Sequence, residues 1–119
     1  MPSTPTTRGR GNGAGASHAE TPVLLWIAFE EEGICYGVCL NRYMVATAPS
    51  RPELEAAIAE MMDAHIETSG DLGIVPFAHL PQAPAEYWSR WLELTSQRPF
   101  KIVAPAPGVQ RPPIQLAAA

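Results

Sequence analysis

The sequence predicts an α+β domain, in which a three- to four-stranded, mainly antiparallel sheet carries one main helix and a short C-terminal helix. Three observations support this prediction. Short runs of β-branched and aromatic residues are separated by turn residues over positions 23–48. Apolar residues recur every three to four positions over 51–70, which indicates a helix buried on one side. A second, aromatic-rich segment covers 84–98 and ends before Pro99. The predicted order of the main elements is β-β-β-α-β.

The first three strands are predicted to form an antiparallel meander. Val23 to Phe29 is a nearly continuous apolar run, as expected of a strand covered in part on both faces. Glu30-Glu31-Glu32-Gly33 is predicted as a hairpin turn, in which Gly33 can adopt a positive φ angle. The second strand is "ICYGVCL", followed by a short turn at Asn41-Arg42 and a third strand, "YMVATA".

The main helix has recognisable ends in the sequence. Ser50 is a good N-cap, and Glu53 three residues later completes a capping box. Pro52 falls in the first turn, where its missing N–H costs little. Gly70 is predicted to follow the last helical residue in the left-handed conformation. One apolar stripe runs along the helix, made of Leu54, Ala57, Ile58, Met61, Met62, His65 and Ile66.

The segment after the main helix is predicted to hold a short fourth strand at Gly73–Phe77 and a final helix that begins at Pro84. Tyr87, Trp88 and Trp91 fall on one side of this helix. We expect these aromatic side chains either to seal the open face of the sheet or to form part of an oligomer or partner interface, where Trp and Tyr are enriched.

Composition divides the chain into three parts. Residues 1–20 hold no large aliphatic or aromatic residue beyond Met1, and residues 99–119 carry five of the thirteen prolines. Neither segment has enough apolar surface to offset the entropy lost on ordering, so both are predicted to be disordered tails, the second rich in Pro and Ala. The domain is therefore predicted over residues 21–98.

The net charge of the predicted domain indicates which class of partner it can bind. Residues 21–98 contain eleven acidic residues and four arginines, a net charge of −7. This charge repels phosphate backbones, so we expect no direct nucleic-acid binding and favour a basic protein partner. No apolar run approaches the length of a membrane span, and the N-terminus lacks the apolar segment of a secretory signal. We expect a cytoplasmic protein, with no membrane association, whose thiols stay reduced.

The two cysteines, Cys35 and Cys39, raise the question of a thiol or metal site. Four positions apart on a helix they would be neighbours, but on a strand they lie about 13 Å apart. A disulfide needs Cα atoms within about 7 Å, and no second Cys or His pair has the spacing of a zinc site. We predict two buried structural cysteines, a structural role for His65, no catalytic residue, and no metal or cofactor.

The exposed hairpin tips are the predicted partner surface. The residues assigned to it are Glu30, Glu31, Glu32, Arg42 and Tyr43, chosen for their charge and expected exposure. Three adjacent acidic residues in a turn are commonly no more than a solvated loop, which is the alternative reading of the triplet.

The segment "WIAFEEEGICYGVCLNRYMVATAPSRPELEAAIAEMMDAHIE" resembles the N-terminal domain of the HicB antitoxin family, and more closely its orphan HicB-like proteins. Cys39-Leu40, Met44-Val45, Ser50 and residues 54–66 carry the resemblance, and "PFAHLPQAPAEYW" looks like the proline and aromatic segment that follows the helix in the orphan group. The resemblance implies a partial ribonuclease-H-like fold without catalytic carboxylates, dimers or higher assemblies, and, in true antitoxins, capture of a small basic ribonuclease toxin, HicA.

The chain departs from that family in two places. Asn41-Arg42-Tyr43 stands where relatives tend to carry an acidic, aromatic, acidic turn. Residues 99–119 cannot form the helix-turn-helix or ribbon-helix-helix domain that true antitoxins use to bind DNA. Repression through DNA is therefore not expected of this chain.

These observations lead us to expect a non-enzymatic, HicB-like protein-binding module that captures a small basic partner such as a HicA-like toxin. One alternative is a self-associating structural or regulatory protein without a toxin. Another is a metal-dependent nuclease of ribonuclease-H type, which needs three or four carboxylates around two Mg²⁺ ions. The first predicted strand, Val23 to Phe29, contains no acidic residue to begin such a site.

Overall fold

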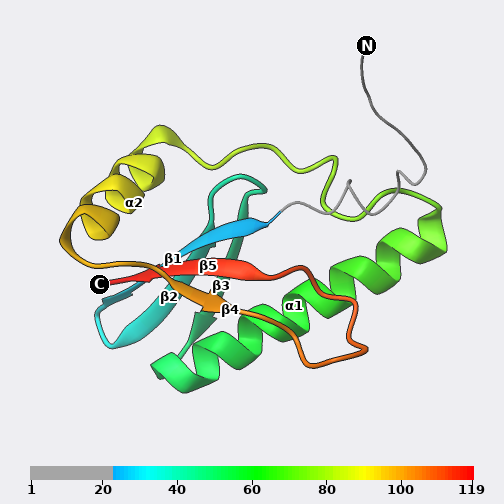
Figure 1. Ribbon diagram of the computed structural model, residues 1–119, viewed down its shortest axis with the longest axis horizontal. Helices are drawn as coiled ribbons and strands as arrows, with labels where there is room; N and C mark the ends of the chain where they lie inside the picture. The colour runs from blue at the N-terminus through cyan, green and yellow to red at the C-terminus, as the bar shows by residue number, and fades with distance from the viewer. Residues whose placement is uncertain (1–22) are drawn as a thin grey trace, which may run out of the picture.

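The computed structural model describes residues 23–119 and confirms the α+β fold (Figure 1). The predicted N-terminal tail, residues 1–20, lies outside the described part. The elements follow in the order β1 (Leu24–Glu31), β2 (Ile34–Cys39), β3 (Met44–Ala48), α1 (Arg51–Leu72), α2 (Ala85–Gln97), β4 (Lys101–Val103) and β5 (Ile114–Ala118).

The five strands form one mixed sheet in the order β3-β2-β1-β5-β4. β1 pairs antiparallel with β2, β2 with β3, and β4 with β5. The one parallel pair joins β1 to β5, with Leu24 opposite Ile114 and Ala28 opposite Ala118. β5 runs parallel to β1 because the chain enters the sheet again at the outer strand β4 and then turns back into β5.

The C-terminal segment differs from its prediction. Residues 99–119 were expected to be a disordered tail, and this is wrong, because Lys101–Val103 and Ile114–Ala118 are strands. β5 lies between β1 and β4 and is hydrogen-bonded on both sides, and its Ile114, Leu116 and Ala117 are buried. The prolines of this segment lie between or before the strands, where they remove no ladder hydrogen bond. The folded part therefore extends beyond the predicted boundary at residue 98.

The strand predicted at Gly73–Phe77 is also wrong, because these residues form turns. Phe77 has a positive φ of 70° and is fully buried. That conformation is incompatible with a strand, and it is held by a side chain of α1 described below. The true additional strands come from the C-terminal segment, which is why the sheet has five strands and not three or four.

Helix α1 begins as predicted and ends later. The Ser50 hydroxyl accepts the Glu53 N–H at 3.4 Å and donates to the Glu53 carboxylate at 2.7 Å. Gly73, with φ 70°, ends the helix and donates its N–H to the Gly70 carbonyl, so the predicted end at Gly70 is three residues too early. α2 covers Ala85–Gln97 and confirms the predicted final helix. None of the helices in residues 23–119 is long and apolar enough to cross a membrane.

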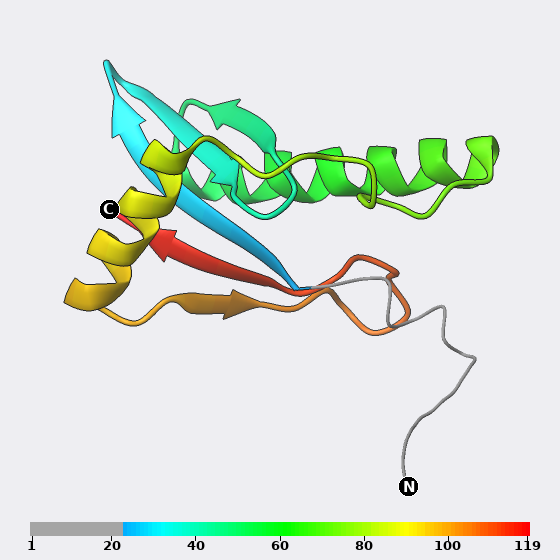
Figure 2. The ribbon, with the colours of Figure 1, turned by 90° about the horizontal axis from the view of Figure 1, so that it is seen from above.

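The helices lie on opposite faces of the sheet (Figures 1 and 2). Side chains along β1 alternate between the two faces, as expected of a strand covered on both sides. Leu24, Trp26 and Ala28 pack with α1, whereas Ile27 and Phe29 pack with α2. The α1 face is completed by Cys35, Cys39, Ala46, Leu54, Ile58, Met62, Phe77, Ile114 and Leu116; the α2 face by Val38, Leu40, Ala83, Leu94 and Ala117.

Candidate partner-binding surface

The predicted partner surface is divided between the two ends of the sheet. Glu30 and Glu31 end β1, and Glu32 and Gly33 form the turn with φ angles of 53° and 79°. All three glutamates are exposed, as predicted. Arg42 and the residues around it lie in the β2–β3 turn, at the other end of β2. Six residues of strand separate the two turns, about 17 Å at 3.3 Å per residue, so one chain does not bring them together.

Arg42 and Tyr43 are half-buried rather than exposed, so the predicted exposure of this second turn is wrong. The connection between the helices covers it. The Tyr43 N–H donates to the Pro81 carbonyl at 2.7 Å, and Arg42 Nη1 donates to the Ala78 carbonyl at 3.5 Å. The Ala83 N–H donates in turn to the Leu40 carbonyl at 2.8 Å.

Asn41 has a structural role that the sequence analysis missed. Its Oδ1 accepts the Leu25 N–H at 3.1 Å, and its Nδ2 donates to the Val23 carbonyl at 2.9 Å. The side-chain amide thus extends the hydrogen-bonded pairing of β2 with β1 beyond the end of β2. An asparagine in a turn is an ordinary sequence signal, but a partner sixteen residues away along the chain cannot be read from it.

Tyr87, Trp88 and Trp91 are half-buried and pack on the α2 face of the sheet. The Tyr87 ring lies 6.2 Å from that of Tyr43, and Arg90 stacks over the Phe29 ring at 4.2 Å. Partial burial raises the pKa of the Tyr87 phenol, and the neighbouring Tyr43 and Glu86 act in the same direction. The aromatic side chains thus cover the sheet on one side, while a role in an interface stays a prediction.

The cysteine environment agrees with the predicted strand. Both thiols are free, lie on β2 and are buried. Burial raises the pKa of the Cys39 thiol to about 12, because the low-dielectric interior disfavours the thiolate. Cys39 is therefore held as a neutral thiol at physiological pH. Within residues 23–119, no group of three His, Cys, Asp or Glu residues is placed to hold a metal ion.

His65 joins α1 to the connection that follows it. Its Nε2 accepts the Phe77 N–H at 3.0 Å, and its ring stacks on Phe77 and on His79 at centroid distances of 4.7 and 5.4 Å. Burial lowers the pKa of His65, and the charge of His79 lowers it further. The neutral imidazole that this favours is the form that can accept the Phe77 N–H.

The strongest charged feature is on α1. After Arg51 the helix contains six acidic residues and no basic one. Two of them are paired with the C-terminal hairpin: Glu55 lies 3.1 Å from Lys101 Nζ, and Asp63 lies 2.8 Å from Arg111 Nε. The other four are exposed and form what we call the acidic row, Glu53, Glu60, Glu67 and Asp71.

The acidic row follows from helix geometry. Glu53, Glu60 and Glu67 are seven residues apart, so they lie on nearly the same side of the helix, opposite the buried Leu54, Ile58 and Met62. The seven-residue spacing was visible in the sequence. The sequence did not show which acidic residues of α1 form ion pairs with Lys101 and Arg111, because both cations come from the segment that was predicted to be a tail.

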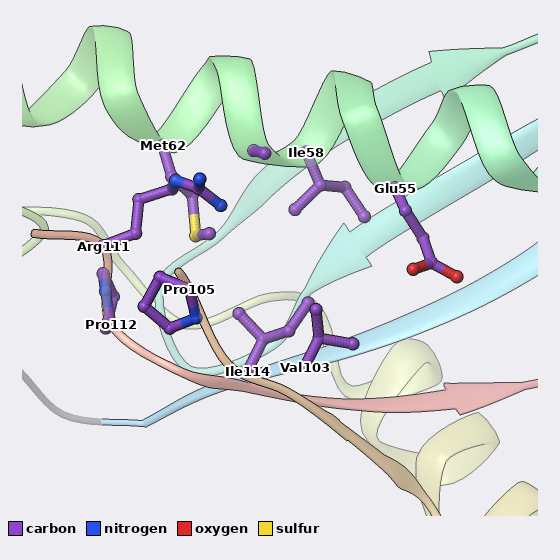
Figure 3. Close-up of a pocket in the computed structure, with 9 residues that line it drawn as sticks. Glu55, Ile58, Met62, Val103, Pro105, Arg111, Pro112 and Ile114 are labelled. Carbon is purple, nitrogen blue, oxygen red and sulfur yellow. The ribbon is translucent and has the colours of Figure 1, made fainter. Parts of the chain in front are cut away.

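A hollow lies between α1 and the β4–β5 hairpin and encloses about 300 Å³ with its open mouth (Figure 3). Its walls are apolar, and Glu55 and Arg111 stand at opposite ends. Both charges already have ion-pair partners, although Arg111 Nε is not aligned with Asp63 for a hydrogen bond. Apart from these two ion-paired side chains the lining is apolar, and we assign the hollow to imperfect packing. The other lining residues are Ile58, Ala59, Met62, Val103, Pro105, Pro112 and Ile114.

Compared with protein families, characterised proteins and solved structures, the chain shows no match. The resemblance to the HicB N-terminal domain therefore rests on the short motifs quoted from the sequence.

Proposed function

We propose that this protein is a non-enzymatic protein-binding module that captures a small basic partner through the acidic row of α1. The observation that carries the proposal is the arrangement of α1, whose inner side is fixed to the sheet while its outer side presents four exposed carboxylates and no cation. A rigid helix with a row of one sign attracts a partner of the opposite sign and holds it in one orientation. The exposed Glu30, Glu31 and Glu32 add to this negative field at the β1–β2 turn.

The HicB-like motifs support the same proposal, because in that family true antitoxins capture a small basic ribonuclease toxin, HicA. In this proposal the chain acts in the cytoplasm, where its two cysteines stay reduced. It uses no metal or cofactor, makes no direct contact with nucleic acid or membrane, and inhibits or positions its partner without catalysing a reaction.

A second candidate function is self-association without a toxin partner, as in the orphan HicB-like proteins. The half-buried aromatic side chains of α2 favour it, because Tyr87, Trp88 and Trp91 keep part of their surface in solvent. Tyr and Trp residues with such partial exposure are enriched in protein interfaces.

Affinity capture from the source organism tests the proposal. The tagged protein is recovered at moderate salt, and co-purifying proteins are identified by mass spectrometry. We expect a small basic protein in near-equal amount, and we expect its recovery to fall as the salt concentration rises. Recovery of the protein with copies of itself alone would instead support the second candidate.

Charge reversal locates the surface. The double substitution Glu60→Lys and Glu67→Lys should lower partner recovery at least tenfold, because the changed side of α1 would repel a basic partner instead of attracting it. The matched control is Glu86→Lys with Glu93→Lys, which makes the same charge change at exposed positions of α2. An equal loss in both double variants would mean that only net charge matters, and no loss in the α1 variant would reject the acidic row as the binding surface.

A further inference from the structure

The two edges of the sheet are protected to different degrees. β4, at one edge, is three residues long, lies between Pro99 and Pro105, and carries Lys101 paired with Glu55. Short length, proline and lysine are the usual devices that prevent an edge strand from pairing with another chain. β3, at the other edge, is five residues long, contains no lysine, and is flanked by a proline at one end alone, Pro49. Its sequence is Met-Val-Ala-Thr-Ala, and its pairing with β2 is continuous and without a bulge.

The hydrogen-bond pattern shows which backbone groups of β3 face outward. The Leu40 N–H donates to Leu25 on β1, so alternate residues of β2, among them Val38 and Tyr36, also face β1. The residues between them face β3 and pair with Met44, Ala46 and Ala48. Val45 and Thr47 must therefore direct their N–H and C=O groups away from the sheet.

The Tyr43 N–H also points outward and donates a hydrogen bond to the Pro81 carbonyl, which agrees with this alternation. Within residues 23–119, no other segment donates to or accepts from the backbone of Val45 or Thr47. Two N–H and two C=O groups thus remain free on this edge, and the Val45 side chain is 42% exposed beside them.

We infer that the β3 edge binds the same edge of a second copy of this chain, as an antiparallel pair about a two-fold axis. One register uses every free group: Val45 opposite Thr47 of the second copy, Thr47 opposite its Val45, and Ala46 opposite its Ala46. The two outer pairs would form four hydrogen bonds, two in each. The central pair is a non-hydrogen-bonded one, at which Cα atoms come within about 4.5 Å, and alanine is small enough for this approach.

The β3 strand itself carries no charge that would repel a second copy. Residues 23–119 are acidic, with eleven acidic against six basic side chains, so most surfaces of two copies repel each other. Between Tyr43 and Pro49 no side chain is charged. In the proposed register Arg42 lies opposite Ser50 of the second copy, next to Glu53, which is hydrogen-bonded to that serine. Arg51 at the same end weakens this contact, and the backbone ladder supplies most of the affinity.

Molar mass in solution tests the inference. It does not rest on the proposed basic partner, because light scattering on the purified full chain needs no other protein. We expect the mass of a dimer over a range of concentrations. Thr47→Pro removes one outward N–H without touching the β2–β3 pairing, and Thr47→Lys places a charge on the edge, so both variants should be monomeric. Far-ultraviolet circular dichroism confirms that each variant folds.

The matched control is Ile102→Lys on the β4 edge, where the side chain is 65% exposed, and this variant should stay dimeric. The register is tested by Ala46→Cys, which should form an interchain disulfide under mild oxidation, since the Cα separation at a central pair suits one. A monomeric parent chain, or a dimer that persists in both Thr47 variants, would overturn the inference. So would a dimer that is lost only in the Ile102→Lys variant.

Discussion

The two helices cover opposite faces of one sheet in different ways. α1 has 22 residues and buries Leu54, Ile58 and Met62 in a continuous aliphatic stripe. α2 has 13 residues and buries only Leu94, while its large aromatic side chains stay half-buried. α1 therefore closes one face of the sheet with buried Leu, Ile and Met side chains, and α2 closes the other with aromatic side chains that are still in contact with solvent.

The outer sides of the helices differ as well. α1 carries acidic residues alone after its first residue, whereas α2 mixes Glu86 and Glu93 with Arg90. The comparison indicates a division of roles. α1 combines a buried apolar side with an acidic outer side, which is the side that we propose for binding, and α2 covers the sheet with half-buried aromatic residues.

Removal of β5 should disrupt the packing on both faces of the sheet, because β5 contributes side chains to each of them. Deletion of residues 114–119 removes Ile114 and Leu116 from the α1 face and Ala117 from the α2 face, and it leaves β1 without a partner on one side. We expect no cooperative thermal unfolding, followed by circular dichroism. Deletion of Ala119 alone is the control and should cost about 1 kcal/mol, the worth of its one hydrogen bond. A cooperative transition in the longer deletion would mean that the sheet is complete without β5.

Ile58→Ala should have the largest effect of the single substitutions. The side chain is 1% exposed and reaches Gly37 on β2, at which an added Cβ would lie 3.1 Å from Ile58 Cδ1. The truncation removes these contacts and enlarges the hollow that Ile58 lines, so we expect a loss of about 3 kcal/mol in the free energy of unfolding. Urea denaturation measures it, and a loss below about 1 kcal/mol would show that the α1 face is loosely packed.

Trp91→Ala should cost less, although the side chain is larger. Trp91 is half-buried and stacks on Phe100 at 5.8 Å, so part of its surface is already hydrated in the folded state. We expect a loss of about 1.5 kcal/mol, because only the buried part of the indole contributes. The same denaturation experiment gives the value. A loss as large as that of Ile58→Ala would remove the distinction between the two faces.

Acidification should destabilise the contact between α1 and the connection that follows it, in which His65 takes part. The pKa of His65 is lowered in the folded state from its usual 6.5, so the unfolded chain binds a proton first. The stabilisation is complete above pH 6.5 and is lost as the pH falls through 6.5 toward the lower folded pKa. Protonation also removes the acceptor of the Phe77 N–H, and a hydrogen bond of this kind contributes about 1 kcal/mol.

His65→Gln supplies the control for this pH dependence. The glutamine Oε1 can accept the Phe77 N–H but does not titrate, so the stability of this variant should change less between pH 7.5 and 5.5 than that of the parent chain. Hydrogen exchange of residues 73–83 should rise on acidification in the parent chain and not in the variant. Equal pH dependence in both proteins would show that another group is responsible.

Local patterns predicted the first half of the fold well. The meander, the capping of α1 at Ser50 and the start of α2 depend on neighbouring residues, and each was visible as alternation, capping or helical periodicity. The cysteine pair was assigned correctly to a strand for the same reason, since residues four apart on a strand point the same way but do not meet.

The remaining parts of the fold and of the site could not be predicted, because they depend on contacts between residues far apart in the sequence. Lys101–Val103 and Ile114–Ala118 are short and lie among prolines, and they form strands only because β1 offers a free edge far away in the sequence. The two ion pairs of α1, and the shielding of Arg42 and Tyr43 by the 78–83 connection, depend on the same long-range contacts. The candidate surface was thus predicted at its acidic turn and missed on α1.

An isotope-edited NMR titration of the labelled chain with the captured partner tests directly whether the outer side of α1 is the binding surface. We predict that the largest amide shifts occur at the acidic row, Glu53, Glu60, Glu67 and Asp71, with smaller shifts at the β1–β2 turn. Shifts confined to α2 around Tyr87 and Trp91, with α1 unchanged, would contradict it.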